Sequence, residues 1–290
     1  MKISERFATG TPFLSVEYFP PKERQDWPAF FQVVDRLTQV RPLFASVTYG
    51  AGGSTQAATL EIVSRMQREC GLETMAHLTC VGAQPERLRA FLDDLAAAGV
   101  GNVLALRGDP PKDMAAAEVT ESPLHFASDL VSFVRTAHPG IGIGVAAYPE
   151  VHPEAVSPEA DLGYLKLKMD LGGEFAITQL FFDNAHYFDF VARARARGIT
   201  KPIIPGILPV VSLKVIQRIV SLCGATLPPA FRAELEEADR SGGAAAVQRV
   251  GIAHARRQAE GLLVGGAPGV HLYTLNRAEA ILAITDGLLT

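Results

Sequence analysis

Glu17 is the residue whose surroundings in the sequence most clearly suggest chemistry. It stands inside the apolar segment Phe13 to Phe19 (FLSVEYF), where burial would penalise a charged carboxylate. We therefore expect a raised pKa for Glu17, and a carboxylic acid with a raised pKa can donate a proton near neutral pH. The competing interpretation is structural, a strand carboxylate that pairs with Arg107 or Arg277.

Several other apolar segments also contain or end in polar residues. These residues are Thr48, His77, Arg107, Asp109, Tyr148, His152, Gln179, Tyr273, Asn276 and Arg277. Any one of them has an ordinary explanation, since a single strand histidine is more often a hydrogen-bonded core residue than a catalyst. In a barrel of parallel strands, however, the carboxyl ends of the strands meet at one mouth. The joint pattern therefore predicts one site at that mouth.

The residue types favour a cofactor over a metal ion or a hydrolytic triad. Hydroxyl, imidazole and ammonium donors that suit a conjugated ring and a pyrophosphate come from Thr48, His77, Tyr148, His152 and Lys168. The histidines lack HxH or HxxxH spacing, and no GxSxG sequence occurs. In the turn RGDPP at 107–111, the glycine permits close backbone approach to a ligand and the prolines fix the exit of the chain.

Eight short apolar segments are predicted to be strands. They span 13–19, 43–49, 74–80, 102–107, 141–148, 175–182, 202–208 and 270–275. Amphipathic helices are predicted between them, at 27–38, 56–69, 85–98, 127–137, 161–171, 186–197 and 213–222. This alternation predicts an α/β fold, a (β/α)8 TIM barrel, in which residues 1–290 form a single catalytic domain.

The segment 228–266 does not fit the alternation. It carries an acidic stretch at 234–239, a Gly-Gly break at Gly242 and a long helical pattern to Leu263, so we expect extra helices before the last strand. A doubly wound nucleotide-binding sheet is disfavoured, because the first turn reads EYFPPKER and the glycines at 140–144 do not complete a GxGxxG motif.

Composition excludes several classes of partner. The 290 residues include 27 Lys+Arg and 31 Asp+Glu, which gives a net charge of −4. The chain therefore lacks the excess positive charge that would favour binding to nucleic acid or to an anionic membrane. Cys70, Cys80 and Cys223 show neither CxxC nor metal-ligand spacing, which fits a reducing compartment. Because the N-terminus lacks a signal-peptide core and no apolar run is long enough to span a membrane, we expect a cytoplasmic protein.

Eight sequence motifs together resemble those of methylenetetrahydrofolate reductases. In chain order they are SVEYFPPK, ASVTYGAGGS, HLTC, NVLALRGDPP, VAAYPEVHPEA, KMDLGGEFAITQLFFDN, IIPGILPV and LYTLNRAE, and the match runs from about Leu14 to Ala278. Their lengths and their order make the resemblance specific. The chain resembles the short bacterial catalytic form, which lacks the C-terminal regulatory domain of the eukaryotic enzymes.

The resemblance implies a flavoprotein of one-carbon metabolism and methionine biosynthesis. Such an enzyme reduces 5,10-methylenetetrahydrofolate to 5-methyltetrahydrofolate, with electrons that pass from NADH or NADPH through FAD in a ping-pong cycle. Relatives are homo-oligomers, so we expect the same here. The alternative is a folate-reducing flavoprotein subunit that receives electrons from a partner protein in a larger redox complex.

The resemblance also implies roles for individual residues. Glu17 would bind the folate and act as the general acid that opens its imidazolidine ring, and Asp109 would stabilise the resulting cation. Further folate contacts would come from Gln179, Tyr273, Leu275 and Arg277. FAD would be held by Thr48, His77, Arg107, Gly108, Asp109, Phe126, Ala127, Ala147, Tyr148, His152, Asp161, Tyr164 and Lys168.

Two features depart from the family pattern. Leu167 stands where some relatives carry an arginine, so one possible phosphate contact is missing and FAD would depend more on Lys168. Some relatives place an aromatic residue on the helix after the seventh strand, whereas Leu213, Val215, Ile216 and Ile219 are aliphatic here.

Overall fold

Parallel strands form the centre of the structure. The computed structural model describes residues 1–7, 10–49, 56–109 and 122–289, and within them nine strands pair in parallel in the order β7-β6-β5-β4-β3-β2-β1-β9-β8. The strands are β1 (Phe13–Tyr18), β2 (Phe44–Val47), β3 (Thr74–Thr79), β4 (Asn102–Leu106), β5 (Gly142–Ala147), β6 (Phe175–Thr178), β7 (Ile203–Ile204), β8 (Gly206–Ile207) and β9 (Gly269–Tyr273). Each predicted strand is found.

Pro205 explains why eight predicted strands become nine. It separates β7 from β8, because a proline has no N–H to donate to a neighbouring strand. β7 pairs with β6 and β8 pairs with β9, so the two short strands together join the ends of the sheet. The Pro205 carbonyl also accepts a hydrogen bond from the His271 backbone N–H at 2.9 Å. The predicted (β/α)8 barrel is therefore confirmed.

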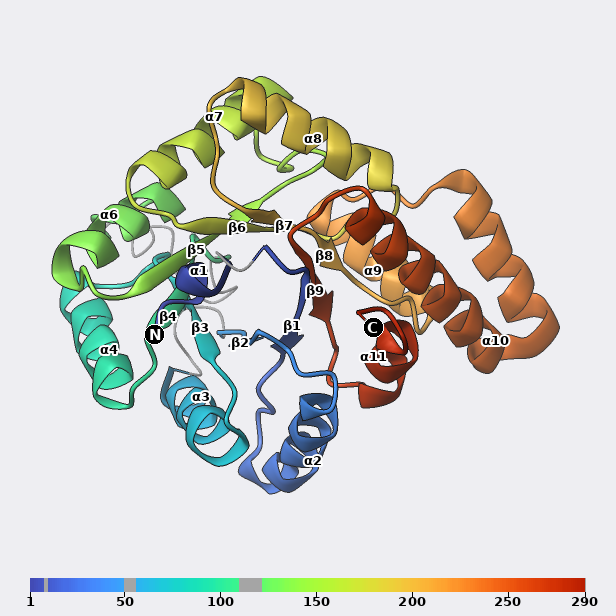
Figure 1. Cartoon of the computed structure of the whole chain (residues 1–290), viewed down its shortest axis with the longest axis horizontal. Helices are drawn as coiled ribbons and strands as arrows, with labels where there is room; N and C mark the ends of the chain where they lie inside the picture. The colour runs from blue at the N-terminus through green and yellow to red at the C-terminus, as the bar shows by residue number, and fades with distance from the viewer. Residues whose placement is uncertain (8–9, 50–55, 110–121, 290) are drawn as a thin grey trace.

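Helices surround the strands, except that α1 lies within the ring in the view of Figure 1. They are α1 (Ile3–Arg6), α2 (Trp27–Thr38), α3 (Gln56–Cys70), α4 (Pro85–Ala97), α6 (Ala127–Ala137), α7 (Pro158–Asp170), α8 (Asn184–Ala196), α9 (Leu213–Cys223), α10 (Pro229–Val264) and α11 (Ala278–Thr285). α7 begins before the predicted start because the Ser157 side chain caps it by accepting from the Ala160 N–H. β6 ends at Thr178, four residues before the predicted end.

The extra helical segment before the last strand is α10, which projects from the side of the barrel in Figure 1. It bends at Gly243, where φ is 58° and ψ is −154°. A residue with a Cβ rarely adopts this conformation, so the predicted Gly-Gly break is where the helix can change direction. Phe231 and Leu235 before the bend and Val247 after it pack on Phe182 and Leu208, beside the barrel.

The barrel interior is divided into an apolar lower part and a polar upper part. Side chains that fill the lower part come from alternate positions of the strands, namely Phe13, Phe44, Met75, Leu104, Phe175, Ile177 and Ile204. Ile3 of α1 is fully buried against them, and its N–H donates to the Asn102 side chain at 2.8 Å. The amino-terminal end of the barrel is thus closed by Ile3 and the side chains around it.

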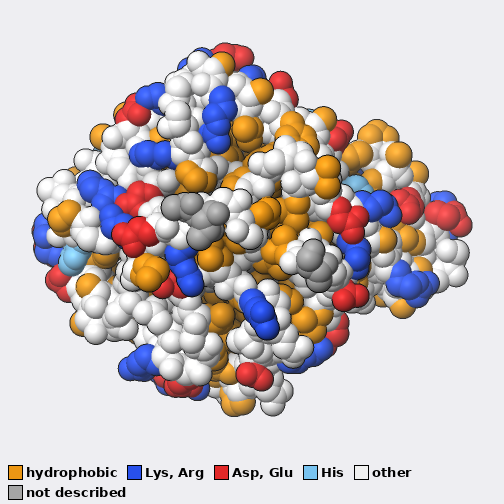
Figure 2. Space-filling view, viewed as in Figure 1, with side chains coloured by type: hydrophobic (Ala, Val, Ile, Leu, Met, Phe, Trp, Pro, Cys, Tyr) orange, Lys and Arg blue, Asp and Glu red, His pale blue; other side chains and the backbone are white. Residues whose placement is uncertain are grey.

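No helix among the described residues combines the length and apolar character needed to cross a membrane. On the face shown in Figure 2, acidic and basic side chains alternate over the surface without a large patch of one sign.

Replacement of Ile3 by alanine tests the role of α1. Because Ile3 is fully buried, we expect Ile3→Ala to lower the free energy of unfolding by about 2 to 5 kcal/mol. Urea unfolding followed by circular dichroism measures this change. Val264→Ala, at an exposed position, should change the free energy by less than about 0.5 kcal/mol. Equal effects of the two substitutions would show that α1 does not contribute to the barrel core.

Candidate functional site

Glu17 lies inside the barrel among four other polar side chains. Its carboxylate oxygen Oε2 is 3.2 Å from His77 Nε2, 3.5 Å from His271 Nε2 and 3.4 Å from Ser46 Oγ, which donates to it. Ser15 Oγ lies 2.8 Å from the other ring nitrogen of His271, Nδ1. We refer to Ser15, Glu17, Ser46, His77 and His271 as the polar cluster. All five are buried, and Glu17 is only 5% exposed.

Strand register places these side chains together. Ser15 and Glu17 are two residues apart on β1, so both face the barrel interior. Ser15 pairs with His271 on β9, and Glu17 pairs with Ser46 on β2. The cluster therefore requires β1, β2, β3 and β9 to be adjacent, which sequence alone does not specify.

His271, Ser15 and Ser46 were missed by the sequence analysis. His271 is fully buried, and its ring stacks on Phe44 with 5.8 Å between centroids and an interplanar angle of 19°. The sequence did contain a signal for Ser15 and His271. Ser15 precedes Glu17 by two residues, and His271 precedes Tyr273 by two residues, so each lies on the same strand face as a residue that was predicted. With a period of two residues, a polar partner on the same strand face could have been sought.

The predicted pKa shift of Glu17 is wrong in direction. Burial by itself raises the pKa, but the charge of His77 and the hydrogen bond and charge of His271 outweigh it and lower the pKa of Glu17 from 4.5 to about 2. The sequence analysis considered the apolar neighbours on the same strand and did not place the two imidazoles. The alternative pairing of Glu17 with Arg107 or Arg277 is also wrong, since its close partners are the two histidines.

The end of β4 carries a second group of predicted residues. Arg107 forms a two-pronged ion pair with Glu154, with N–O distances of 2.5 and 2.8 Å. Gly108 has φ of +81°, and a Cβ there would lie 2.8 Å from the Thr79 side chain, so only glycine fits this turn. Asp109 follows and is exposed. Pro110 and Pro111 lie outside the described residues.

The loop after β5 and the helix α7 bring four more predicted residues together. The Tyr148 and His152 rings meet edge to face with centroids 4.6 Å apart, and the His152 backbone N–H donates to Asp161 at 3.0 Å. Lys168 Nζ donates to the Ala146 carbonyl at 2.6 Å. Burial lowers the pKa of Lys168 to about 8, although the nearby charge of Asp161 opposes this shift. Burial likewise raises the pKa of Tyr148 to about 12.

Four other residues predicted to hold the cofactor have simpler surroundings. Thr48 follows β2 and is half-buried, and its backbone N–H donates to the Tyr18 carbonyl at 3.0 Å. Ala147 is buried at the end of β5. Phe126 is 62% exposed immediately before α6, and Ala127 is the first residue of that helix.

Tyr164 on α7 is 58% exposed. No contact among the described residues joins it, Phe126 or Ala127 to the polar cluster.

The predicted folate contacts lie at the ends of β6 and β9. The Tyr273 hydroxyl donates to the Thr178 carbonyl at 2.7 Å, which fixes the ring between these strands. Burial raises the pKa of Tyr273 well above its ordinary value. Gln179 is half-buried directly after β6, and its Oε1 accepts from the Leu180 N–H at 2.9 Å.

The chain turns sharply after β9. Leu275 and Asn276 both have positive φ, at 46° and 55°, which is uncommon for residues other than glycine. The Asn276 side chain holds this turn to the end of β1, because it accepts from the Phe19 N–H at 3.0 Å and donates to the Phe19 carbonyl at 2.7 Å. Arg277 is exposed and precedes α11.

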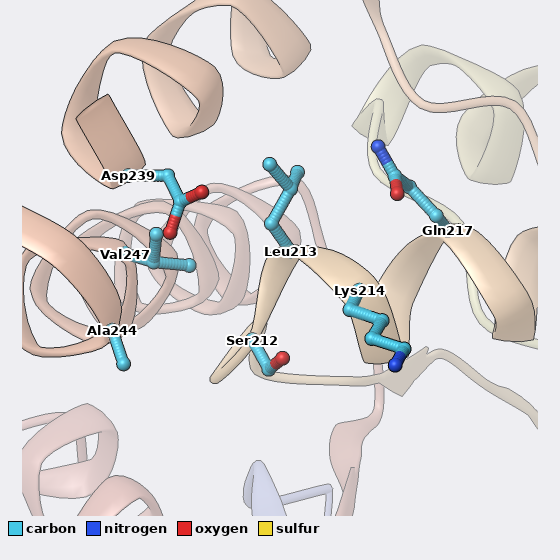
Figure 3. A pocket seen from close by; sticks show the side chains of 7 residues that line it. All are labelled: Ser212, Leu213, Lys214, Gln217, Asp239, Ala244 and Val247. Carbon is cyan, nitrogen blue, oxygen red and sulfur yellow. The ribbon is translucent and has the colours of Figure 1, made fainter.

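A cavity of about 260 Å³ lies beside the barrel, between α9 and α10. Leu213, Lys214 and Gln217 of α9 line it together with Ser212, and the residues from α10 are Asp239, Ala244 and Val247 (Figure 3). None of the predicted catalytic, cofactor or folate residues lines this cavity. It is therefore a feature separate from the strand ends.

The donors around the strand ends fit a cofactor with a phosphate-bearing tail. Lys168 has three N–H bonds, and one of them is directed to the Ala146 carbonyl. His77 Nε2 is buried and has no aligned hydrogen-bond partner among the described residues, although it lies near the Glu17 carboxylate. Within the described part of the chain, no group of three or more His, Cys, Asp or Glu residues could hold a metal ion.

Comparison with protein families gives a match over nearly the whole chain. The methylenetetrahydrofolate reductase family matches residues 2–288. Methylenetetrahydrofolate reductase (NADH) 1 of Arabidopsis thaliana is 38% identical over 297 residues, which cover 99% of this chain and 50% of the plant protein. The chain thus spans about half the length of this plant relative. The 5,10-methylenetetrahydrofolate reductase of Escherichia coli (strain K12) is also 38% identical, over 95% of this chain and 90% of the bacterial protein.

Solved structures with low sequence identity share the fold. A protein from Clostridium thermocellum that binds two copies of 5-methyl-5,6,7,8-tetrahydrofolic acid superimposes with a TM-score of 0.65 at 14% identity, covering 99% of this chain and 98% of the other. Oxaloacetate acetylhydrolase superimposes with a TM-score of 0.52 at 10% identity, covering 99% and 84%.

Acid unfolding tests the direction of the Glu17 pKa shift. The folded chain favours the carboxylate, so its contribution to stability is present above pH 4.5 and is lost as the pH falls from 4.5 toward 2. We expect the difference in unfolding free energy between wild type and Glu17→Gln to shrink over this range. Urea unfolding at a series of pH values measures it, with the exposed Glu234→Gln as control. A difference that stays constant over this range would contradict the lowered pKa.

Proposed function

The chain belongs to the methylenetetrahydrofolate reductase family, and we propose that it reduces 5,10-methylenetetrahydrofolate to 5-methyltetrahydrofolate, with a nicotinamide nucleotide as electron donor and FAD as bound cofactor. The observation that carries this proposal is the Glu17 carboxylate, buried between two imidazoles inside the barrel of a chain that matches the family from residue 2 to residue 288. The Clostridium thermocellum protein of the same fold, which binds a methylated tetrahydrofolate, supports a folate ligand.

The reaction consumes one proton, and the polar cluster is suited to provide it. Opening of the imidazolidine ring breaks a C–N bond, and the nitrogen that leaves must be protonated. His77 Nε2 and His271 Nε2 lie 3.2 and 3.5 Å from Glu17 Oε2, so a proton can pass between an imidazole and the carboxylate. Glu17 then transfers the proton to the folate nitrogen.

Residues around the strand ends would hold FAD. When bound, FAD supplies hydride transfer between the nicotinamide and the folate. We propose that Lys168 contacts the pyrophosphate, because its part-buried ammonium lies beside the end of β5, where it donates to the Ala146 carbonyl. Thr48, His77, Arg107, Gly108, Tyr148, His152 and Asp161 would surround the ring and the ribose, and Phe126, Ala127, Ala147 and Tyr164 would contact the remainder of the cofactor.

Other side chains would position the folate and stabilise its cationic form. Asp109 is exposed directly after the Gly108 turn, where a negative charge would stabilise the iminium cation that forms when the ring opens. Gln179 Oε1 accepts from Leu180, so its amide NH₂ is the part directed to the pterin. The Tyr273 hydroxyl is bonded to Thr178, so this residue would contribute its ring, with Leu275 and Arg277 nearby in the sequence.

The two substrates would use one pocket in turn. We propose NADH or NADPH as the donor, and the plant relatives named for NADH favour NADH. We also propose a homo-oligomeric assembly, as expected from the family.

An anaerobic absorbance experiment tests the function. Purified protein with FAD should lose its flavin absorption bands when NADH is added and regain them when 5,10-methylenetetrahydrofolate follows. Glu17→Gln should still bleach with NADH but should regain the bands at least a hundredfold more slowly, since it lacks the acid. If neither NADH nor NADPH bleaches bound flavin, the electron donor is a partner protein. Normal recovery in Glu17→Gln would remove Glu17 from the acid role.

The pH dependence of FAD binding tests Lys168. The free protein loses the Lys168 charge as the pH rises through about 8, whereas an anionic phosphate favours the charged form. We therefore expect FAD affinity to be constant below pH 8 and to fall by up to about tenfold per pH unit above it. Quenching of flavin fluorescence measures the affinity. Lys168→Met should weaken binding and remove this dependence, while Lys166→Met, on the same helix but paired with Asp170, should keep it.

A further inference from the structure

His271 and Ser15 lie at the deepest level of the polar cluster. On the paired strands it is level with Ser15, two residues before Glu17 in the direction of the strand ends. Its side chain is fully buried, whereas the side chains of Glu17 and His77 retain 7% and 8% exposure. Glu17 thus lies between His271 and the mouth, with its Oε2 3.5 Å from His271 Nε2, where it can pass a proton from His271 to a ligand.

Both ring nitrogens of His271 face hydrogen-bond partners. Nδ1 faces Ser15 Oγ at 2.8 Å, and Ser15 Oγ is itself 3.4 Å from the Val270 carbonyl. When the Ser15 hydroxyl donates to that carbonyl, its oxygen accepts from a protonated Nδ1. Nε2 then faces Glu17 Oε2 and Ser46 Oγ, each at 3.5 Å. A charged imidazole can therefore direct both of its N–H groups to acceptors.

Among the residues that the structure describes, the only carboxylate that pairs with the His271 ring is that of Glu17. Glu17 faces it from β1, and His77 lies beyond Glu17 on β3. Tyr273 lies edge-on with centroids 5.4 Å apart, and Phe44 stacks on the other side. Ser15 and Ser46 are neutral. A positive charge on His271 would therefore be balanced by Glu17 and by no second carboxylate among the described residues.

We propose that His271, held by Ser15, is a positioning residue that stores the proton of the folate step behind Glu17. This inference rests on the proposed function. Before folate binds, the proton resides on His271 and Glu17 is a paired carboxylate. When the pterin covers the mouth, the loss of solvent disfavours a separated charge pair and favours the neutral acid and neutral imidazole. The proton then moves to Glu17.

One proton is transferred in each turnover, and for each bond that forms another breaks. The N–H bond at His271 Nε2 breaks and an O–H bond forms at Glu17, after which that O–H bond breaks as the folate nitrogen takes the proton. The nitrogen keeps the electron pair of its broken C–N bond, and hydride from the nicotinamide reductant later reduces the cation. Once the product leaves, a proton from solvent restores the cluster. The nicotinamide half-reaction needs no proton from this store.

Measuring the two half-reactions of His271→Gln separately distinguishes proton storage from a structural role. A glutamine amide can replace the Nε2 hydrogen bond but cannot carry the proton. We expect flavin reduction by NADH to remain within twofold of wild type from pH 6 to pH 9.5. The rate of folate-dependent reoxidation should fall at least tenfold at high pH, and the pH at which it is half-maximal should move down by at least one unit. Ser15→Ala removes only the hydrogen-bond partner of Nδ1. It should lower the pH of half-maximal reoxidation by less than His271→Gln does.

Matched substitutions control for the loss of a buried polar group. His138→Gln removes another imidazole close to a carboxylate, 3.1 Å from Asp93, and Ser64→Ala removes a buried hydroxyl on α3. Neither should change either half-reaction. A fall in the folate step of His271→Gln that is equal at every pH would overturn the proposal and leave a structural role. Absence of folate-dependent reoxidation in wild type would instead refute the proposed function.

Discussion

The ion pairing of Glu17 inside the barrel constrains four strands at once. A buried carboxylate is costly unless charged or hydrogen-bonding partners surround it, and here the partners come from β2, β3 and β9. Their contacts need the register in which Ser15 pairs with His271 and Glu17 with Ser46. A shift of one residue in β1 would turn Glu17 outward, toward the helices, and leave two imidazoles without their carboxylate.

The apolar lower part of the barrel makes this arrangement possible. Ile3 and the side chains around it exclude water from below, so the polar cluster is open to ligands only from the carboxyl ends of the strands. The same exclusion strengthens the attraction between Glu17 and the histidines. Around that opening, the Arg107–Glu154 pair joins the loops that follow β4 and β5, and Lys168 of α7 donates to the Ala146 carbonyl on β5. The residues proposed for acid chemistry and for anion binding are thus held by strands of one sheet, β1 and β5.

Most strands and helices were predictable because each has a local signal. Periodic apolar residues locate α2 and α6 with the same ends as in the structure, and the Gly-Gly pair locates the bend in α10. The errors also have physical causes. The apolar run after Thr178 continues as a buried loop that packs under α10, so hydrophobicity alone extended β6 too far. The short helix α1 has little periodicity, and tertiary contacts of Ile3 stabilise it.

The sequence by itself determined the alternation of strands and helices, the family, and the residue types that end the strands, because these depend on local spacing and on ordered motifs. Only the tertiary structure decided which groups face one another. Arg107 pairs with Glu154, and the predicted rise in the Glu17 pKa becomes a fall, since the charge partners of a residue come from strands distant in the sequence. His271 is 254 residues from Glu17, and parallel pairing of β1 with β9 is what brings its ring to the carboxylate.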